Sequence, residues 1–208
     1  SYTPISSSIT NNFINLPYGI VGINSTLDGI YNFKFENIHY STNYPSKTGG
    51  IAILGQSMTV DSRLNVGDMN TATDIKENTF LNCRYGVMAI GKCKPVIKYN
   101  NFIHTLANFQ NLTSISVLNC SVANPQGIFL GPIEIKNNTF TESQFFNTGL
   151  AAPFLSTAIS VSNGIQLRQN MDISWNQMHN MRMGIYLNNI IGDQTNPDGL
   201  SIHDNQIQ

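Results

Sequence analysis

The chain has 208 residues, 11 Lys plus Arg against 12 Asp plus Glu, and charged residues make up only 11% of it. Ordinary soluble domains carry roughly 25% charged residues, and a near-neutral chain without a basic cluster lacks the electrostatic footprint of proteins that bind nucleic acid or anionic membranes. Hydrophobic residues make up 41% of the chain and recur periodically, which excludes a disordered polar chain.

A six-residue pattern recurs along the chain: an apolar residue, two variable residues, Asn, one variable residue and a second apolar residue. Seven copies predict a single repeat domain over residues 1–208, because repeats determine a fold before local propensity does. The second copy is a shifted variant of the pattern. In chain order, the copies begin at Ile9, Phe33, Ile75, Ile97, Ile135, Ile173 and Ile202.

Each copy lies beside two further strand signals. A short alternating run such as Leu200–Ile202 precedes the Asn, and a Gly-led apolar strand lies upstream of that run. No segment has the pattern of a capped helix of about ten residues or more. In one repeat, either residues 158–161 or residues 164–167 could supply the upstream strand. The other upstream strands begin at Gly19, Gly50, Gly86, Gly127 and Gly184.

The pattern Ile-x-Ile-x-x-Asn-x-Phe followed by a Gly-Ile-x-Leu strand resembles the right-handed parallel β-helix of the pectate-lyase-like superfamily, over nearly the whole chain. The resemblance implies an all-β, three-sheet solenoid of about seven coils with long loop insertions. It also implies an internal ladder of Asn side chains at the bend between the second and third strands of each coil. The residues at that bend are Asn12, Asn37, Asn78, Asn100, Asn138, Asn176 and Asn205.

Spacing between successive ladder Asn residues predicts where loops are inserted. A bare coil needs about 22 residues, and the surplus places insertions at 55–72, 103–126, 141–157 and 188–199. These insertions flank the Gly-led strands, so the first sheet is expected to lie in a walled groove. Loops on a rigid scaffold are where function usually resides.

The outward positions of the Gly-led strands test whether this groove carries catalytic chemistry. Strand alternation places Val21, Ala52, Met88, Phe129, either Ser160 or Gln166, and Tyr186 at these positions, and none of them is a carboxylate or a base. The Asp-rich and Arg-Ile-Lys motifs of related lyases and glycosidases are absent. Asp61, Arg63 and Arg84 are the remaining weak catalytic candidates, and Ca²⁺ is expected only if the chain is a lyase.

The apolar outward positions have two interpretations. Met88, Phe129 and Tyr186, with Gln166, would form a ligand-binding platform for sugar rings or a partner protein. Alternatively, residues 103–126 fold over this stripe and cover it. The apolar residues available for that cover are Leu106, Phe109, Leu112, Ile115 and Leu118.

On the second sheet, outward positions form an acidic row of Asp74, Glu134 and Asp172 and a basic row of Lys76, Lys98 and Lys136, which predicts a solvated wall. The three Cys residues have no Cys-x-x-Cys spacing and the four His are scattered, so no metal site is expected. Cys83 and Cys93 could form a disulfide, although buried free thiols are the favoured interpretation.

These observations favour a non-catalytic module of a secreted or cell-surface protein, such as a stalk or an adhesin, that binds a polysaccharide or a surface protein. The alternatives are a polysaccharide lyase or glycoside hydrolase whose catalytic turns lie partly outside this chain, and a purely structural spacer. No apolar run is long enough for membrane insertion. Both ends lack polar caps, so we expect a longer chain, with its remainder or neighbouring subunits stacked on the coil ends.

Overall fold

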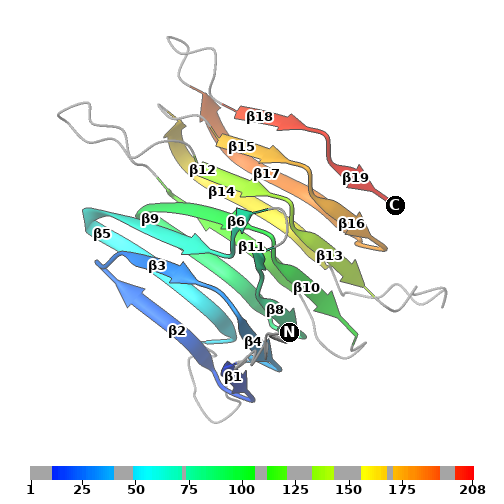
Figure 1. Ribbon diagram of the computed structural model, residues 1–208. Coiled ribbons are helices and arrows are strands. Elements are labelled where there is room, and N and C mark those ends of the chain that lie inside the picture. Colours follow the sequence, from blue (N-terminus) through cyan, green and yellow to red (C-terminus); the bar gives the residue numbers. More distant parts are fainter. Residues whose placement is uncertain are drawn as a thin grey trace.

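The computed structural model describes residues 11–39, 49–71, 74–105, 112–120, 133–142, 156–167, 171–192 and 200–208, with the backbone alone at 69–71, 74, 163–167 and 190–192. Every regular element in this part of the chain is a β-strand, and nearly all neighbouring strands run parallel (Figure 1). The all-β prediction is therefore confirmed.

One seven-stranded parallel sheet, which we call the third set, collects the short strands that follow the Asn positions. Its order is β1 (Asn11–Ile14), β4 (Phe33–Glu36), β8 (Thr79–Leu81), β10 (Asn101–His104), β13 (Thr139–Glu142), β16 (Gln177–His179) and β19 (Gln206–Ile207).

A ten-stranded sheet contains two further sets, joined through the long strands β5 and β9. The first set has the order β2–β5–β9–β11–β14–β17 and the second β3–β5–β9–β12–β15–β18. The bounds are β2 (Tyr18–Ile23), β3 (Leu27–Ile30), β5 (Ile51–Val66), β9 (Tyr85–Lys98), β11 (Thr113–Leu118), β12 (Ile133–Lys136), β14 (Thr157–Leu167), β15 (Met171–Ser174), β17 (Met183–Gly192) and β18 (Leu200–His203).

The chain visits the first, second and third sets in the same order again and again, and strands of successive turns lie side by side from the blue end to the red end (Figure 1). This topology of parallel strands in curled sheets is compatible with a β-solenoid. A two-stranded antiparallel hairpin of β6 (Asp68–Thr71) and β7 (Asp74–Lys76) departs from the pattern.

The Asn ladder exists over the five turns from Asn78 to Asn205. The Asn138 side chain is typical: its Oδ1 accepts from the backbone N and the Nδ2 of Asn100, at 3.0 and 3.1 Å. Its Nδ2 donates to the carbonyl of Ile97 at 3.0 Å and to Oδ1 of Asn176 at 3.1 Å. Each amide thereby satisfies backbone groups that the bend would otherwise leave unpaired in the interior.

A stack of aromatic rings in the third set fixes the register of the ladder. Neighbouring rings lie 4.5–5.1 Å apart between centroids and are nearly parallel, and the column continues through Met178 and Ile207. Each ladder Asn precedes the stacked residue by two positions. The stacked rings are Phe13, Phe35, Phe80, Phe102 and Phe140.

This register corrects two ladder assignments. Because Phe35 stacks on Phe80, Phe33 and not Asn37 occupies the ladder position in that turn, and the backbone N of Phe33 donates to Oδ1 of Asn78 at 3.1 Å. In the first turn, Asn11 and not Asn12 shares the register of Phe33.

Asn37 has a different structural role, at the corner after the third set. Its φ is +53°, and Asn15, Asn82 and Asn180 hold the equivalent positions with φ between +53° and +58°. Non-glycine residues rarely adopt this left-handed region, and Asn tolerates it better than most. Among the residues that the structure describes, Asn therefore serves both the ladder and the corners.

Three element predictions were wrong. Residues 55–66, expected in an insertion, belong to strand β5. Residues 113–118, expected in an insertion, form β11 and supply the first-set strand between β9 and β14; Ile115 is fully buried in the core. Asp74 and Lys76, expected on the second sheet, lie in the β6–β7 hairpin, and the second-set strand of that turn is the end of β5. Residues 127–130 lie outside the described part of the chain.

The three Cys residues are buried free thiols, as the favoured interpretation predicted. Burial raises the pKa of Cys83 to about 12 and that of Cys93 to about 11, so neither is a thiolate at neutral pH. Cys93 lies in the core beside Gly55 of the preceding turn.

Gly86→Ala is expected to lower the free energy of unfolding by about 1–3 kcal/mol through overpacking. A Cβ at Gly86 would lie 2.5 Å from Cε1 of Phe102 and 2.6 Å from the carbonyl oxygen of Ser114. Gly184→Ala is the matched control, because its nearest neighbours are the ends of flexible side chains, Met178 Sδ at 3.0 Å and Ile207 Cδ1 at 3.2 Å. Urea unfolding of both variants checks this, and equal losses would contradict it.

Candidate binding face

The outward residues of the first set form one continuous row across six strands. Strand register confirms four of the predicted outward positions: Val21, Met88, Ser160 and Tyr186. The outward position predicted for Ala52 was wrong, because Ala52 is fully buried in the core. The complete row is Val21, Leu54, Met88, Ser116, Ser160 and Tyr186.

Two further outward rows flank this one, the first running from Tyr18 to Met183 and the second from Ile23 to Asn188. The side-chain chemistry of the three rows changes along the molecule. Apolar side chains dominate strands β2, β5 and β9, and hydroxyl side chains dominate β11 and β14, before Tyr186 on β17. None of these rows contains a carboxylate, Lys, Arg or His. The hydroxyl residues are Thr113, Ser116, Thr157, Ser160 and Ser162.

Burial divides the predicted ligand-binding residues. Met88 is only 7% exposed and packs with Ile51 and Leu54 in a small apolar cluster of its own. Tyr186 is 42% exposed, and two strands, β11 and β14, separate it from Met88. At about 4.8 Å per strand, the two side chains start about 14 Å apart and do not form one contiguous platform.

The two other predicted ligand-binding residues, Gln166 and Phe129, are not part of the outward row that the structure shows. Gln166 pairs with Ile191 beyond a register shift in β14, whereas Ser160 pairs with Tyr186, so Ser160 takes the outward place that the sequence left open between them. Phe129 lies outside the described residues, and β11 fills the place predicted for its strand.

The three weak catalytic candidates, Asp61, Arg63 and Arg84, do not lie together at one site. Arg63 lies in the second-set part of β5 opposite Lys94, with Asp61 in the irregular segment just before it. Arg84 precedes β9, with its guanidinium carbon 5.2 Å from the centre of the Tyr85 ring. Residues 85–91 separate the two places by about 20 Å of extended chain.

A buried polar corner between the third and first sets was not predicted. Ser114 Oγ lies 3.4 Å from Nε2 of His104, and both residues are buried. His104 neighbours Glu142 in the strand register, and the Ser156 hydroxyl donates to the Glu142 carboxylate. His104 and Glu142 each lie two residues after a stacked Phe, where other turns have Asn, and this position is the signal that could have found them.

This corner resembles a nucleophile beside a base, but its burial favours a packing role. Ser114 is 1% exposed, whereas a nucleophile must reach substrate. Burial lowers the pKa of His104 to about 4, so the ring is neutral at pH 7. Burial also raises the pKa of Glu142, against the hydrogen bond from Ser156.

The outward side of the second set is a charged wall, as predicted for Lys98, Glu134, Lys136 and Asp172. Lys98 pairs with Glu134, and Lys136 Nζ lies 2.7 Å from Asp172. Burial is the largest single influence and alone would raise the pKa of Asp172, but the hydrogen bonds and positive charges around the carboxylate, led by the hydrogen bond from Lys136, together hold that pKa below its usual value. These partly exposed pairs span successive turns and leave the first set as the uncharged face.

Within the described residues, no three His, Cys, Asp or Glu side chains gather as metal ligands. The same part of the chain contains no helix long and apolar enough to cross a membrane.

Comparison with known proteins found no match to any family model, any curated protein or any solved structure.

Proposed function

We propose that this chain is a right-handed parallel β-helix that serves, without catalysis, as a binding or stalk module of a secreted or cell-surface protein. Its first set would present an uncharged face to a polysaccharide or a surface protein. The observation that carries this proposal is the outward row from Val21 to Tyr186, which crosses six strands without one carboxylate or base.

Two features support the finer description of the fold. The chain passes through three parallel strand sets in a constant order, which is how a three-sheet coil winds. Crossovers between parallel strands of one sheet are right-handed in nearly all known cases, so the same hand is proposed here.

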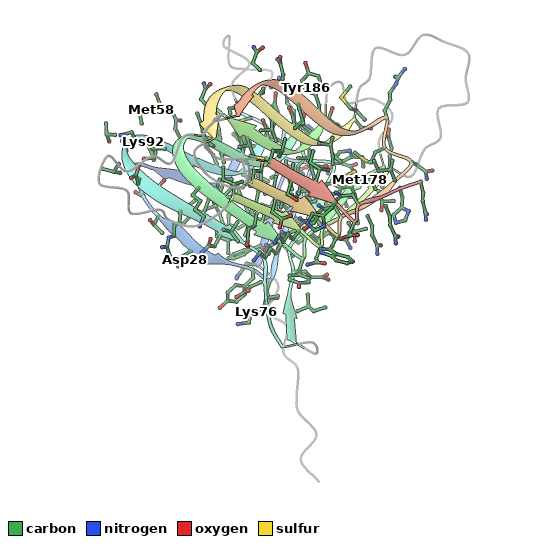
Figure 2. The ribbon with its side chains drawn as sticks, turned by 90° about the horizontal axis from the view of Figure 1, so that it is seen from above. Asp28, Met58, Lys76, Lys92, Met178 and Tyr186 are labelled. Atoms are coloured by element: carbon green, nitrogen blue, oxygen red, sulfur yellow. The ribbon has the colours of Figure 1, made fainter. Side chains whose placement is uncertain are left out.

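The exposed part of the face suggests the kind of contact. Tyr186 offers an open aromatic ring, and the partly buried Ser160 and Ser162 lie on the adjacent strand. An aromatic ring can pack on the apolar face of a sugar while hydroxyls exchange hydrogen bonds with its substituents. Figure 2 shows Tyr186 at the outer surface of the sheets.

Binding to a glycan array, followed by calorimetry on the best glycan, tests this proposal. Tyr186→Ala is expected to weaken binding at least tenfold, about 1.4 kcal/mol, because the ring stacking is lost. Trp175→Ala is the matched control, since Trp175 is an exposed aromatic residue that follows β15 of the second set and lies off this face. Unchanged affinity in Tyr186→Ala would reject this face as the binding site.

The lyase alternative can be examined in the same preparation. A lyase acting on uronate polymers creates a product with a new carbon–carbon double bond, which absorbs in the ultraviolet. We expect no such product, because the register neighbour of Arg63 is Lys94 rather than a carboxylate. Product formation that Arg63→Ala abolishes would replace our proposal by the lyase.

A further inference from the structure

Two aromatic residues occupy a backbone conformation that bulky side chains rarely adopt. Tyr99 has a φ of +55° and Trp175 a φ of +59°. Among the described residues, ten other non-glycine residues have a positive φ; nine of them are Asn and the tenth is Asp204. Asn and Asp tolerate this region because their short polar side chains bond the local backbone, whereas a bulky residue there is an outlier. Strain of this kind is a pointer to function.

Both aromatic residues lie at the same corner of the coil, between the second and third sets, two turns apart. Tyr99 lies between β9 and β10 and Trp175 between β15 and β16, each directly before a ladder residue. Asn137 holds this corner in the turn between them, with a φ of +55°. The three corners follow one another along the molecule (Figure 1). At about 4.8 Å per strand, the two aromatic residues start about 10 Å apart.

Packing within the molecule does not account for either ring. Trp175 is 56% exposed, and its ring contact among the described residues is an edge-on one with His203, at 6.4 Å between centroids. Tyr99 is half-exposed, and within the same part of the chain its side chain has neither a ring contact nor a hydrogen bond. Asn137 shows that an amide serves the backbone at this corner without strain from a ring. Neither the backbone nor the core gains from the two rings, which leaves contact with a ligand as their use.

Beside this corner, the third set supplies a row of hydrogen-bonding side chains. Asn101, Thr139 and Gln177 each follow a corner residue by two positions and pair with one another across β10, β13 and β16 without a register shift. We call these three residues the neutral row. They are half-buried or exposed, and none of their side chains forms a hydrogen bond within the described part of the chain. Their donors and acceptors are therefore available to a ligand along three successive turns.

The charged side chains on the other side of the corner are paired with each other. Lys98 pairs with Glu134, and Lys136 Nζ lies 2.7 Å from Asp172. The neutral row itself has no ionisable side chain. A charged polymer would have to compete with these ion pairs, whereas an uncharged ligand leaves them intact. The charges around the corner therefore favour an uncharged ligand.

We propose that this corner binds an extended, uncharged glycan that runs along the stacked turns over Tyr99, Asn137 and Trp175. Aromatic rings pack on the apolar faces of sugars, and placed polar groups fix the orientation of a ligand. In an extended glycan whose successive rings face opposite ways, alternate rings present the same face to the protein, and two sugar rings span about the length between Tyr99 and Trp175. The neutral row then exchanges hydrogen bonds with the sugar hydroxyls. This corner is separate from the first set, and the inference does not depend on what the first set binds.

Titration calorimetry with four uncharged hexasaccharides, cellohexaose, chitohexaose, mannohexaose and xylohexaose, tests this inference. The unaltered chain should bind at least one of them, and Tyr99→Asn and Trp175→Asn should each weaken that binding at least tenfold. Asn is the residue that the corner already uses at Asn32 and Asn137, so both variants should unfold at the same urea concentration as the unaltered chain or a higher one. A loss of binding without a loss of stability separates ligand contact from a structural role.

Tyr186→Ala is the matched control, because it removes an exposed aromatic ring from the first set and should leave hexasaccharide binding at the corner unchanged. The two residues thus exchange the roles that they have in the test of the first set. Binding that both substitutions to Asn leave intact, including binding that only Tyr186→Ala weakens, would overturn the inference. So would the absence of binding to all four hexasaccharides.

Discussion

Asn138→Ala is expected to lower the free energy of unfolding by about 3–5 kcal/mol, because it leaves buried backbone groups without hydrogen-bond partners. The side chain is 1% exposed and lies in the middle of the ladder. Its removal leaves the backbone N–H of Asn100 and the carbonyl of Ile97 without partners in the interior. Each buried group left unpaired costs about 1–3 kcal/mol.

Urea unfolding followed by far-ultraviolet circular dichroism measures this loss. Asn101→Ala is the matched control, because Asn101 follows the ladder residue Asn100 by one position, lies on the outward side of β10, and makes no ladder bond with its side chain. That variant should lose less than about 1 kcal/mol. If the two substitutions cost the same, the ladder contributes no more than an ordinary surface amide.

The fold was largely predictable from the sequence because one strong signal repeats. An apolar residue two positions after an Asn recurs in six of the seven copies, and five ladder residues from Asn78 onward were placed correctly. The errors at Asn12 and Asn37 share one cause. The ring stack through Phe13, Phe35 and Phe80 sets the register, and the apolar residue chosen from the sequence as the anchor, Ile14 or Ile38, was not the stacked ring. In the first turn Asn11 holds the position two residues before the ring, and in the second turn Phe33 does.

The candidate face was only partly predictable. Period-two alternation placed Val21, Met88 and Tyr186 in one row, since alternation states which side of a strand a residue occupies. Alternation does not tell whether other side chains cover that side, so it could not predict that Met88 is buried. Strand β11 was missed because Thr113-Ser114-Ile115 has no leading Gly, and its identity follows only from pairing with β9 and β14.

Acidification should destabilise the molecule through His104. Burial lowers the pKa of this ring from 6.5 to about 4 in the folded chain, whereas the unfolded chain keeps an ordinary pKa near 6.5. Between these values the unfolded chain binds the extra proton, so stability falls as pH falls. The loss accumulates to about 3 kcal/mol once the pH has dropped from 6.5 to 4.

The physical reason is that a charged imidazolium would lie 4% exposed beside the core, with no hydrogen bond to its Nδ1 from the described residues. The raised pKa of Glu142 acts in the opposite direction, because its folded form retains a proton that the unfolded form releases as pH rises. Comparing variants at each pH separates the two contributions.

Unfolding free energies measured from pH 7 to pH 4 for the unaltered chain and for His104→Gln test this expectation. The variant has no titrating ring, so the fall in stability attributed to His104 should disappear from its profile. Ser114→Ala is the matched control: it removes the hydroxyl 3.4 Å from Nε2 but leaves the buried ring in place, so its profile should keep the fall. A His104→Gln profile parallel to that of the unaltered chain would show that acid sensitivity arises elsewhere, and that His104 is accommodated as a cation by a rearranged corner.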